Sequence, residues 1–362
     1  MKLLMAFDSF KGTLTSTEAG SIAAKAAIAL GCEAKIAAVS DGGEGMTEAF
    51  ISANQAEMLS VRTVDPLYNE IDVSFAMAGT TALIECAFAA GLGLVPPSKR
   101  NPRKTTTYGL GMMIKKALDN GAKKVIIGLG GSATNDGGTG MAAALGAIFK
   151  NSHGESFIPT GETLGEISSI DIAHMHNRIA EAEFVACCDV TNPLCGNNGA
   201  SHIYAPQKGA SESDVELLEA NMLHYASMLG NDIADFPGSG AAGGLGAAVK
   251  YYLSGTLAPG FEVISSLIGL EDKIMNADVV LTGEGCTDSQ TENGKLPAGV
   301  AKIARKYSKP CYIISGAVKG KPHIYGALKI IPTTEMPGMP TKEIAEERLY
   351  NTVYNLLKET LK

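Results

Sequence analysis

The sequence has no long basic run, no long apolar run and no Cys-x-x-Cys pair. Its formal net charge is −8, which argues against nucleic acid or an anionic membrane as the main partner. No uninterrupted apolar stretch reaches the roughly 18 residues of a membrane helix, and we expect neither a membrane span nor a signal peptide. Seven scattered cysteines, an odd number, favour reduced thiols in a cytoplasmic enzyme. The six histidines include no His-Glu-x-x-His zinc motif.

Glycine, by contrast, is abundant, and six glycines crowd into the thirteen positions from Gly128 to Gly140. The β-branched run Val125–Ile127 before them is typical of a buried strand, and the spacing from Met141 to Phe149 predicts a helix. Such a loop lets backbone N–H groups approach a ligand closely, and the helix N-terminus that follows favours an anion. We therefore expect this loop to hold a phosphate or carboxylate, although a tight turn that binds nothing has the same composition.

Two familiar nucleotide motifs fit the glycine loop poorly. A Walker A loop would end in Gly-Lys-Ser/Thr, which is absent here. Gly128, Gly130 and Ala133 match a dinucleotide fingerprint, but no acidic residue about 20 positions later could bind a ribose. A nucleotide-cofactor oxidoreductase thus stays an alternative, as does a non-catalytic protein that binds small anions.

The order of predicted elements indicates an α/β protein of two domains. A strand at Lys2–Phe7, a helix after the capping box Thr15–Glu18 and a strand at 34–39 open the chain, and βα alternation returns at 277–362. Between them, 58–64 and 71–77 are expected to form antiparallel strands. We place one discontinuous parallel-sheet domain at 1–60 and 277–362, and an inserted mixed α/β domain at 61–276.

Polar residues follow several predicted strands, at the sheet edge where α/β proteins bind ligands. Helix capping is the alternative role for each of them, notably for Asp41. Three threonines before a predicted helix could hold a carboxylate or simply cap that helix through Thr107. The candidate binding residues are Asp8, Ser9, Gly42, Gly43, Thr106, Gly130, Gly131, Ser132, Asn135, Asp136, Lys208 and Lys295. A second glycine-rich segment, from Gly238, is either another anion site or a place of close helix packing.

Phosphoryl transfer requires positioning, a metal on the phosphates, donors for the developing charge and a carboxylate that takes the hydroxyl proton. Glu284 and Asp288 are the expected Mg²⁺ ligands, since this ion usually binds one or two carboxylates and retains water. The candidate catalytic residues are Asp189, Lys11 and Asp41; Asp189 ends an apolar strand, where a carboxylate could act as the base. Capping of the following turn, at Thr191 and Asn192, is the other role open to Asp189.

Several blocks of this sequence resemble the glycerate kinase family of the type that has neither a ribokinase nor an actin-like fold. They occur in family order and span nearly the whole chain. The blocks are DSFKGTLT from Asp8, DGGEG from Asp41, NPRKTTTYG from Asn101, the glycine loop, DVTNPLCG from Asp189, APQKGA from Ala205, GSGAAGGLG from Gly238 and TGEGCTDSQTENGKLPAGVA from Thr282.

The resemblance implies two α/β domains, of which the discontinuous one is flavodoxin-like. It also implies ATP- and Mg²⁺-dependent phosphorylation of D-glycerate to 2-phosphoglycerate, with 3-phosphoglycerate as the alternative product. This chain departs from the family at Cys286, where an arginine is usual. If that arginine contacts phosphate in relatives, a neighbour such as Lys295 would have to replace it here.

Overall fold

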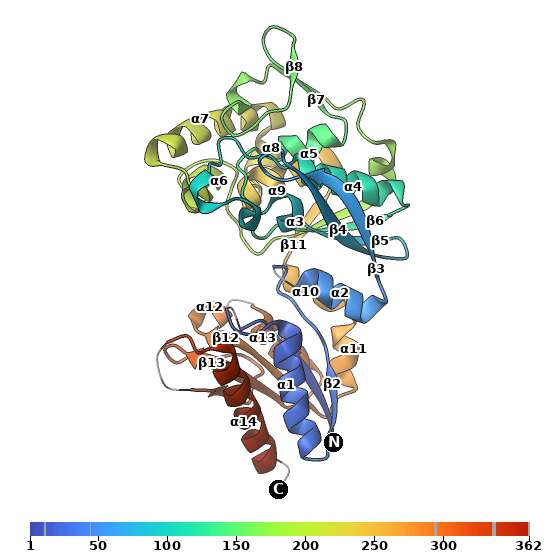
Figure 1. The fold of residues 1–362 in the computed structure, drawn as a ribbon, viewed down its shortest axis with the longest axis vertical. Helices are drawn as coiled ribbons and strands as arrows, with labels where there is room; N and C mark the ends of the chain where they lie inside the picture. The colour runs from blue at the N-terminus through green and yellow to red at the C-terminus, as the bar shows by residue number, and fades with distance from the viewer. Residues whose placement is uncertain (11, 44, 293–294, 335–337, 361–362) are drawn as a thin grey trace. The chain divides into compact units, whose positions relative to one another are not determined.

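The computed structural model describes residues 1–10, 12–43, 45–292, 295–334 and 338–360 (Figure 1). The chain forms two compact units: a discontinuous unit, Met1–Gln55 with Phe261–Lys362, and a continuous unit, Ala56–Gly260. The boundaries predicted from the sequence lie near Ser60 and Asn276. Residues 261–276 group with the discontinuous unit because they pack there: the side-chain amide of Asn54 donates to the carbonyl of Leu267 at 3.2 Å. The ring of Phe261 also lies against Gly299, in the space that a Cβ would fill.

The discontinuous unit is built from βα repeats. Its elements are β1 (Lys2–Phe7), α1 (Ser16–Ala29), β2 (Glu33–Ile36), α2 (Met46–Asn54), α10 (Gly260–Leu267), α11 (Leu270–Met275), β12 (Val279–Thr287), α12 (Ser289–Glu292), α13 (Leu296–Lys306), β13 (Cys311–Val318), β14 (Lys329–Pro332) and α14 (Lys342–Thr360). As expected, Thr15 and Glu18 form a capping box that starts α1.

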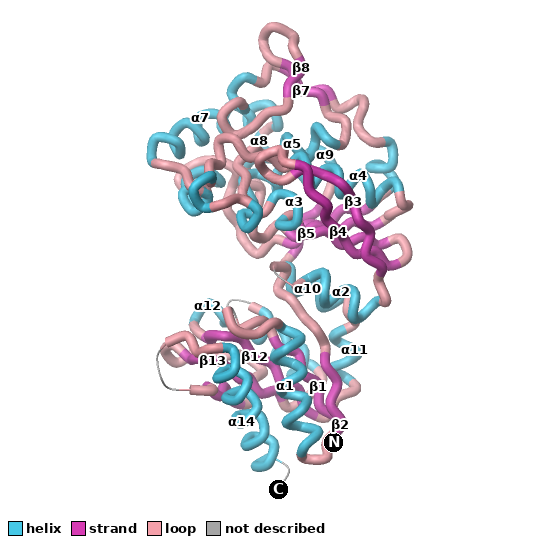
Figure 2. Tube along the Cα trace, viewed as in Figure 1, coloured by secondary structure: helices cyan, strands magenta, loops and turns pink. Residues whose placement is uncertain are grey.

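The five strands of this unit form one parallel sheet in the order β14-β13-β12-β1-β2. Counted within the unit alone, the order is 2-1-3-4-5, which is the flavodoxin-like order. Helices α1 and α14 pack side by side (Figure 2). Apolar side chains of β1, α1 and α14 form a core there, with Phe7, Ala23 and Val353 fully buried. The predicted α/β class with a flavodoxin-like domain is confirmed.

Strand β12 is a long strand of nine residues. Gly283, Glu284 and Gly285 lie inside it. The reason is pairing: β12 continues beside β13 as far as Thr287, which is opposite Val318. Glu284 therefore projects from a sheet strand, and a strand holds a side chain more rigidly than a loop does.

The continuous unit is a mixed α/β domain. Its elements are β3 (Glu57–Val64), β4 (Glu70–Ala78), β5 (Thr81–Glu85), α3 (Ala87–Ala90), α4 (Tyr108–Asp119), β6 (Lys124–Gly128), α5 (Thr139–Ala144), β7 (Ile148–Lys150), β8 (Ser156–Phe157), β9 (Ser169–Asp171), β10 (Glu183–Cys187), α6 (Ala200–Tyr204), α7 (Glu212–Leu229), α8 (Asn231–Ala234), α9 (Ala241–Leu253) and β11 (Thr256–Ala258). Short 3₁₀ turns join several of them, and one, η5 (Pro206–Lys208), bears on the site.

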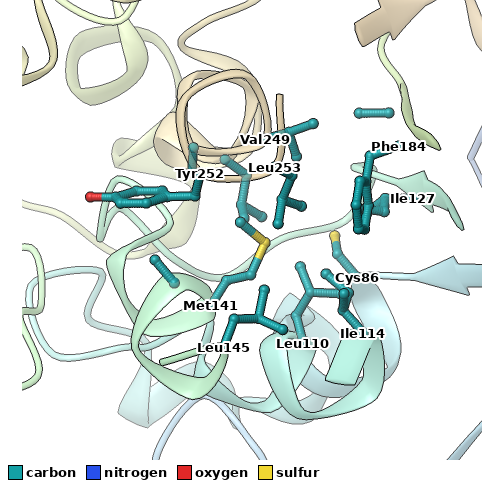
Figure 3. Close-up of a cluster of buried hydrophobic side chains, with 14 of the residues drawn as sticks. Cys86, Leu110, Ile114, Ile127, Met141, Leu145, Phe184, Val249, Tyr252 and Leu253 are labelled. Atoms are coloured by element: carbon teal, nitrogen blue, oxygen red, sulfur yellow. The ribbon is translucent and has the colours of Figure 1, made fainter. Parts of the chain in front are cut away.

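The main sheet of this unit has the order β11-β10-β6-β5-β4-β3. Strands β3 and β4 pair antiparallel, as predicted. Strand β5 also pairs antiparallel with β4, and β5, β6, β10 and β11 are parallel to one another. The carboxyl ends of four strands therefore meet at one edge. Buried apolar side chains pack on the sheet, among them Leu110, Ile127, Met141 and Phe184 (Figure 3).

The predicted helix from Met141 to Phe149 is wrong in its second half. Helix α5 ends at Ala144, and β7 starts at Ile148 in a small antiparallel sheet with β8 and β9. Gly146 ends the helix because its φ is +107°, and a Cβ there would lie 2.3 Å from the carbonyl oxygen of His174. The apolar residues from Met141 to Phe149 are spaced as in a single helix, but the first of them belong to α5 and the last to β7.

All seven cysteines are free thiols. Burial raises the pKa of Cys86, Cys187, Cys195 and Cys311 to about 12, so these thiols stay protonated at neutral pH. Within the described ranges, no helix is both long and apolar enough to cross a bilayer.

Candidate active site

The glycine loop lies at the carboxyl edge of the main sheet in the continuous unit, between β6 and α5. Its first half is hydrogen bonded to the segment after β5: the N–H of Leu92 donates to Gly131, and that of Ala133 to Ala90, each at 2.8 Å. Gly130 and Gly131 are exposed, whereas every residue from Ser132 to Gly140 is buried. The loop thus exposes the backbone of Gly130 and Gly131, whereas its polar side chains, from Ser132 onward, are buried.

Asp136 is fully buried and holds this loop against the start of α4. Its Oδ2 accepts hydrogen bonds from the N–H and the hydroxyl of Thr107, both at 2.8 Å, and from the N–H of Gly140. Its Oδ1 accepts from the N–H of Gly138 at 3.2 Å. Burial raises the pKa of Asp136, and these four donors oppose the shift by favouring the carboxylate. The carboxylate is thus surrounded by protein donors and holds the glycine loop against the start of α4.

Thr106 and Thr107, just before α4, also form hydrogen bonds at the place where the glycine loop meets α4 and α5. Thr107 does not cap its own helix through its side chain; its hydroxyl accepts from the N–H of Met141 and so caps α5. Capping of α4 by Thr107 was therefore the wrong alternative. Thr106 is also fully buried, and its hydroxyl accepts from the N–H of Tyr108 at 3.1 Å.

The side chain of Lys208, in η5, reaches the glycine loop. Its Nζ donates to Ser132 Oγ at 3.0 Å and to the carbonyl oxygen of Thr134 at 2.7 Å, and the residue is only 3% exposed. Burial lowers the pKa of Lys208 to about 8. A lysine with a perturbed pKa beside a glycine-rich loop is a candidate for anion binding.

Asn135 lies in the same loop and has a polar atom without a partner. Its Nδ2 donates to Ser201 Oγ at 3.2 Å, but among the described residues its Oδ1 has no hydrogen-bond donor. The hydroxyl of Thr134 is in the same condition. Buried acceptors of this kind are rare in folded proteins and are commonly satisfied by water or a ligand.

The second glycine-rich segment packs against the first one. Gly243 accepts a hydrogen bond from the N–H of Gly137 at 3.0 Å. A Cβ on Gly243 would lie 2.0 Å from the carbonyl oxygen of Thr134, and one on Gly244 would lie 2.7 Å from the Cα of Gly137. Of the two readings that the sequence left open, close packing is the one these contacts support.

Asp189 follows β10, as expected. Its Oδ1 accepts a hydrogen bond from the N–H of Gly260 at 2.9 Å, 71 positions later in the chain. Gly260 is the first residue of α10. This contact holds the carboxylate at the end of the strand through a residue that the sequence did not indicate.

In the discontinuous unit, Asp8 and Asp41 come after neighbouring strands. The Oδ1 of Asp8 accepts from the N–H of Ser9 at 2.7 Å, and the Oδ1 of Asp41 accepts from the N–H of Gly43 at 3.1 Å. The N–H of Gly42 donates to Ser40 Oγ. Asp41 thus closes a local turn ahead of α2 and does not cap that helix, whose N-cap residue, Gly45, has no side-chain hydrogen bond. Lys11, an expected catalytic residue, lies outside the described residues.

Among the described residues of this unit, Glu284 is the buried carboxylate. Its Oε1 accepts from the hydroxyls of Thr291 at 2.6 Å and Thr287 at 3.0 Å. Burial raises the pKa of Glu284, the two hydroxyls and the charge of Lys295 oppose the shift, and the charge of Asp288 adds to it. Asp288 and Lys295 thus both act electrostatically on Glu284.

The pair Glu284 and Asp288 fits a magnesium ion in its donor chemistry. The described residues contain no group of three or more His, Cys, Asp or Glu side chains placed for a metal. Mg²⁺ does not need such a group, because it binds one or two carboxylates and completes its shell with water and phosphate oxygens.

Some residues of the site were not predicted from the sequence. Thr287 and Thr291 lie in the block from Thr282, and their spacing around Glu284 could have marked them. Ser201 and Cys86 had no such signal, because they meet the loop from 66 and 44 positions away.

Comparison with known proteins places the chain in a family. The glycerate kinase family model matches residues 3–360. The chain is 42% identical over 326 residues to glycerate 2-kinase of Escherichia coli (strain K12), covering 88% of this chain and 86% of that one. It is 39% identical over 369 residues to a glycerate kinase of Bacillus cereus (strain ATCC 10987 / NRS 248), covering 98% and 97%.

A solved structure agrees with these matches. The crystal structure of "putative glycerate kinase 2" from Salmonella typhimurium LT2 superposes with a TM-score of 0.89 at 36% identity, over 99% of this chain and 98% of that one. The chain therefore belongs to the glycerate kinase family, which confirms both the resemblance in its motifs and the prediction that it is a kinase.

Proposed function

We propose that this protein transfers the γ-phosphoryl group of ATP to the 2-hydroxyl of D-glycerate, with Mg²⁺ as cofactor. The observation that carries this proposal is the 42% identity to a glycerate 2-kinase over 88% of the chain. The arrangement of the polar residues supports it, because glycine-rich backbone and buried carboxylates are what phosphoryl transfer requires of a protein.

Asp189 is the proposed base. A carboxylate near the attacking hydroxyl accepts its proton as the bond to phosphorus forms. The Gly260 N–H at 2.9 Å fixes one oxygen of Asp189, so the carboxylate has a defined orientation. Lys11 and Asp41 complete the proposed catalytic assignment, as expected from the sequence.

Glu284 and Asp288 would hold the Mg²⁺. When bound, this ion neutralises charge on the phosphate oxygens. Thr287 and Thr291 fix Glu284 Oε1 and keep the carboxylate oriented, and Lys295 adds a positive charge nearby.

The remaining polar residues bind the anionic parts of the substrates. In the continuous unit these are Thr106, Gly130, Gly131, Ser132, Asn135, Asp136 and Lys208, with Asp136 acting through the loop that it holds. In the discontinuous unit they are Asp8, Ser9, Gly42 and Gly43, with Asp8, itself an anion, acting through the Ser9 N–H that it binds. The seven free cysteines support a reducing compartment, and we retain a cytoplasmic location within the proposal.

The activity can be tested directly on the purified protein. With Mg-ATP and D-glycerate we expect phosphoglycerate, with the phosphate on the 2-oxygen, detected by ³¹P NMR of the product. Reactions without protein and with L-glycerate serve as controls. A spectrum that shows only 3-phosphoglycerate would overturn the regiochemistry, and absence of any phosphorylated product would overturn the function.

A further inference from the structure

Lys208 is a buried ammonium group without a paired carboxylate. Its two hydrogen-bond acceptors, Ser132 Oγ and the Thr134 carbonyl, are both neutral. Asp136 acts on Lys208 only through space, and its oxygens accept from Thr107, Gly138 and Gly140. Within the described part of the chain, no acidic side chain forms an ion pair with Lys208. Buried lysines are usually paired, because removing the charge from water is costly.

The apolar surroundings of Lys208 screen its positive charge only weakly. The thiol of Cys86 donates to the carbonyl oxygen of Gly130 in the glycine loop, and Figure 3 shows Cys86 among the apolar side chains of the core, near Leu110 and Ile114. A charge beside such a core is poorly screened, so an oxyanion that reached the Nζ would be held strongly. An ammonium group has three hydrogens, and the hydrogen bonds to Ser132 and Thr134 leave one for a ligand.

A second observation indicates that the ligand also carries a hydroxyl. Asn135 is fully buried, and its Oδ1 has no donor among the described residues. Asn135 and Lys208 are neighbours, since Lys208 binds the carbonyl of the preceding residue, Thr134. A ligand with one negative charge and a nearby hydroxyl would satisfy both groups.

We propose that Lys208 and Asn135 form the acceptor subsite in the continuous unit, with Lys208 on the carboxylate of D-glycerate and Asn135 Oδ1 accepting from its 3-hydroxyl. This inference rests on the proposed function, which leaves the 3-hydroxyl as the one that does not react. A single buried cation matches a monocarboxylate better than a triphosphate, which carries several charges and needs several donors. The subsite thereby selects small hydroxycarboxylates.

Binding measurements on the full-length protein test the subsite separately from turnover. D-Glycerate is titrated calorimetrically in the presence of Mg²⁺ and a non-hydrolysable ATP analogue, and the affinity for that analogue is measured on its own. For Lys208→Gln and Lys208→Met we expect D-glycerate affinity to fall about 10- to 100-fold, the range of a charge-assisted hydrogen bond. The analogue should bind as in the wild type. Lys116→Gln, at an exposed position on α4, should change neither affinity.

The Asn135→Leu variant tests the same subsite whether or not the Lys208 variants fold. It should weaken D-glycerate binding and leave D-lactate, which lacks the 3-hydroxyl, unaffected. Loss of analogue affinity in place of glycerate affinity would assign Lys208 to the nucleotide and overturn the inference. Unchanged glycerate affinity in folded Lys208 variants, or no binding of D-glycerate by the wild type, would overturn it too. A wild type that forms phosphoglycerate while these variants bind normally would leave the proposed function standing and remove only the subsite.

Discussion

Asp189 is a carboxylate whose two possible roles can be separated by one substitution. Asp189→Asn keeps an oxygen that can accept from the Gly260 N–H, so the local fold should persist. It removes the basicity, and we expect kcat to fall by roughly 10²–10⁴ with ATP affinity retained. Steady-state kinetics with D-glycerate measure this, with Asp72→Asn on the exposed side of β4 as the matched control. Near-normal turnover would eliminate Asp189 and make Asp41 the next candidate.

Glu284 and Asp288 provide the residue-scale prediction for the metal. Glu284→Gln preserves an oxygen for Thr287 and Thr291 but removes the negative charge, so the Mg²⁺ concentration for half-maximal activity should rise. Asp288→Asn should act in the same direction. Titration of activity with Mg²⁺ at saturating ATP measures both, and exposed Glu271→Gln serves as control. If neither variant shifts the Mg²⁺ dependence, these carboxylates are not the ligands.

At the scale of elements, the two glycine-rich segments are expected to depend on each other sterically. Gly243→Ala would place a Cβ 2.0 Å from the Thr134 carbonyl oxygen at a residue whose φ is +75°. Because the chain must shift as well as accept a strained φ, we expect the free energy of unfolding to fall by about 2–4 kcal/mol. Gly79→Ala is the matched control: its φ is +57°, but nothing lies within 4 Å, so only about 1 kcal/mol is expected. Urea unfolding measures both, and equal losses would show that the contact between the segments is not tight.

At the scale of the whole molecule, the two units differ in how the chain builds them. The continuous unit, 56–260, contains its six-stranded sheet and its apolar core within one stretch of chain. We expect this stretch, expressed alone, to fold cooperatively, whereas 1–55 alone should not, because β1 would lack its partner β12. Circular dichroism and urea unfolding of the two fragments check this. A disordered 56–260 fragment would contradict the division into self-contained cores.

The sequence by itself determined the α/β class, the parallel discontinuous domain, the antiparallel β3–β4 pair and the family. These follow from local patterns: alternation of strand and helix, a capping box at Thr15, and blocks whose order along the chain is visible without a fold. Only the tertiary structure decided where α5 stops, that Glu284 lies within β12, and that Asp136 and Thr107 join two helices. It also brought Lys208 and Ser201 to the glycine loop. The physical reason is that these outcomes depend on groups far apart in the chain, such as Thr107 and Asp136, 29 positions apart, or Lys208 and Ser132, 76 positions apart. The approach of such groups leaves no periodic trace in the sequence.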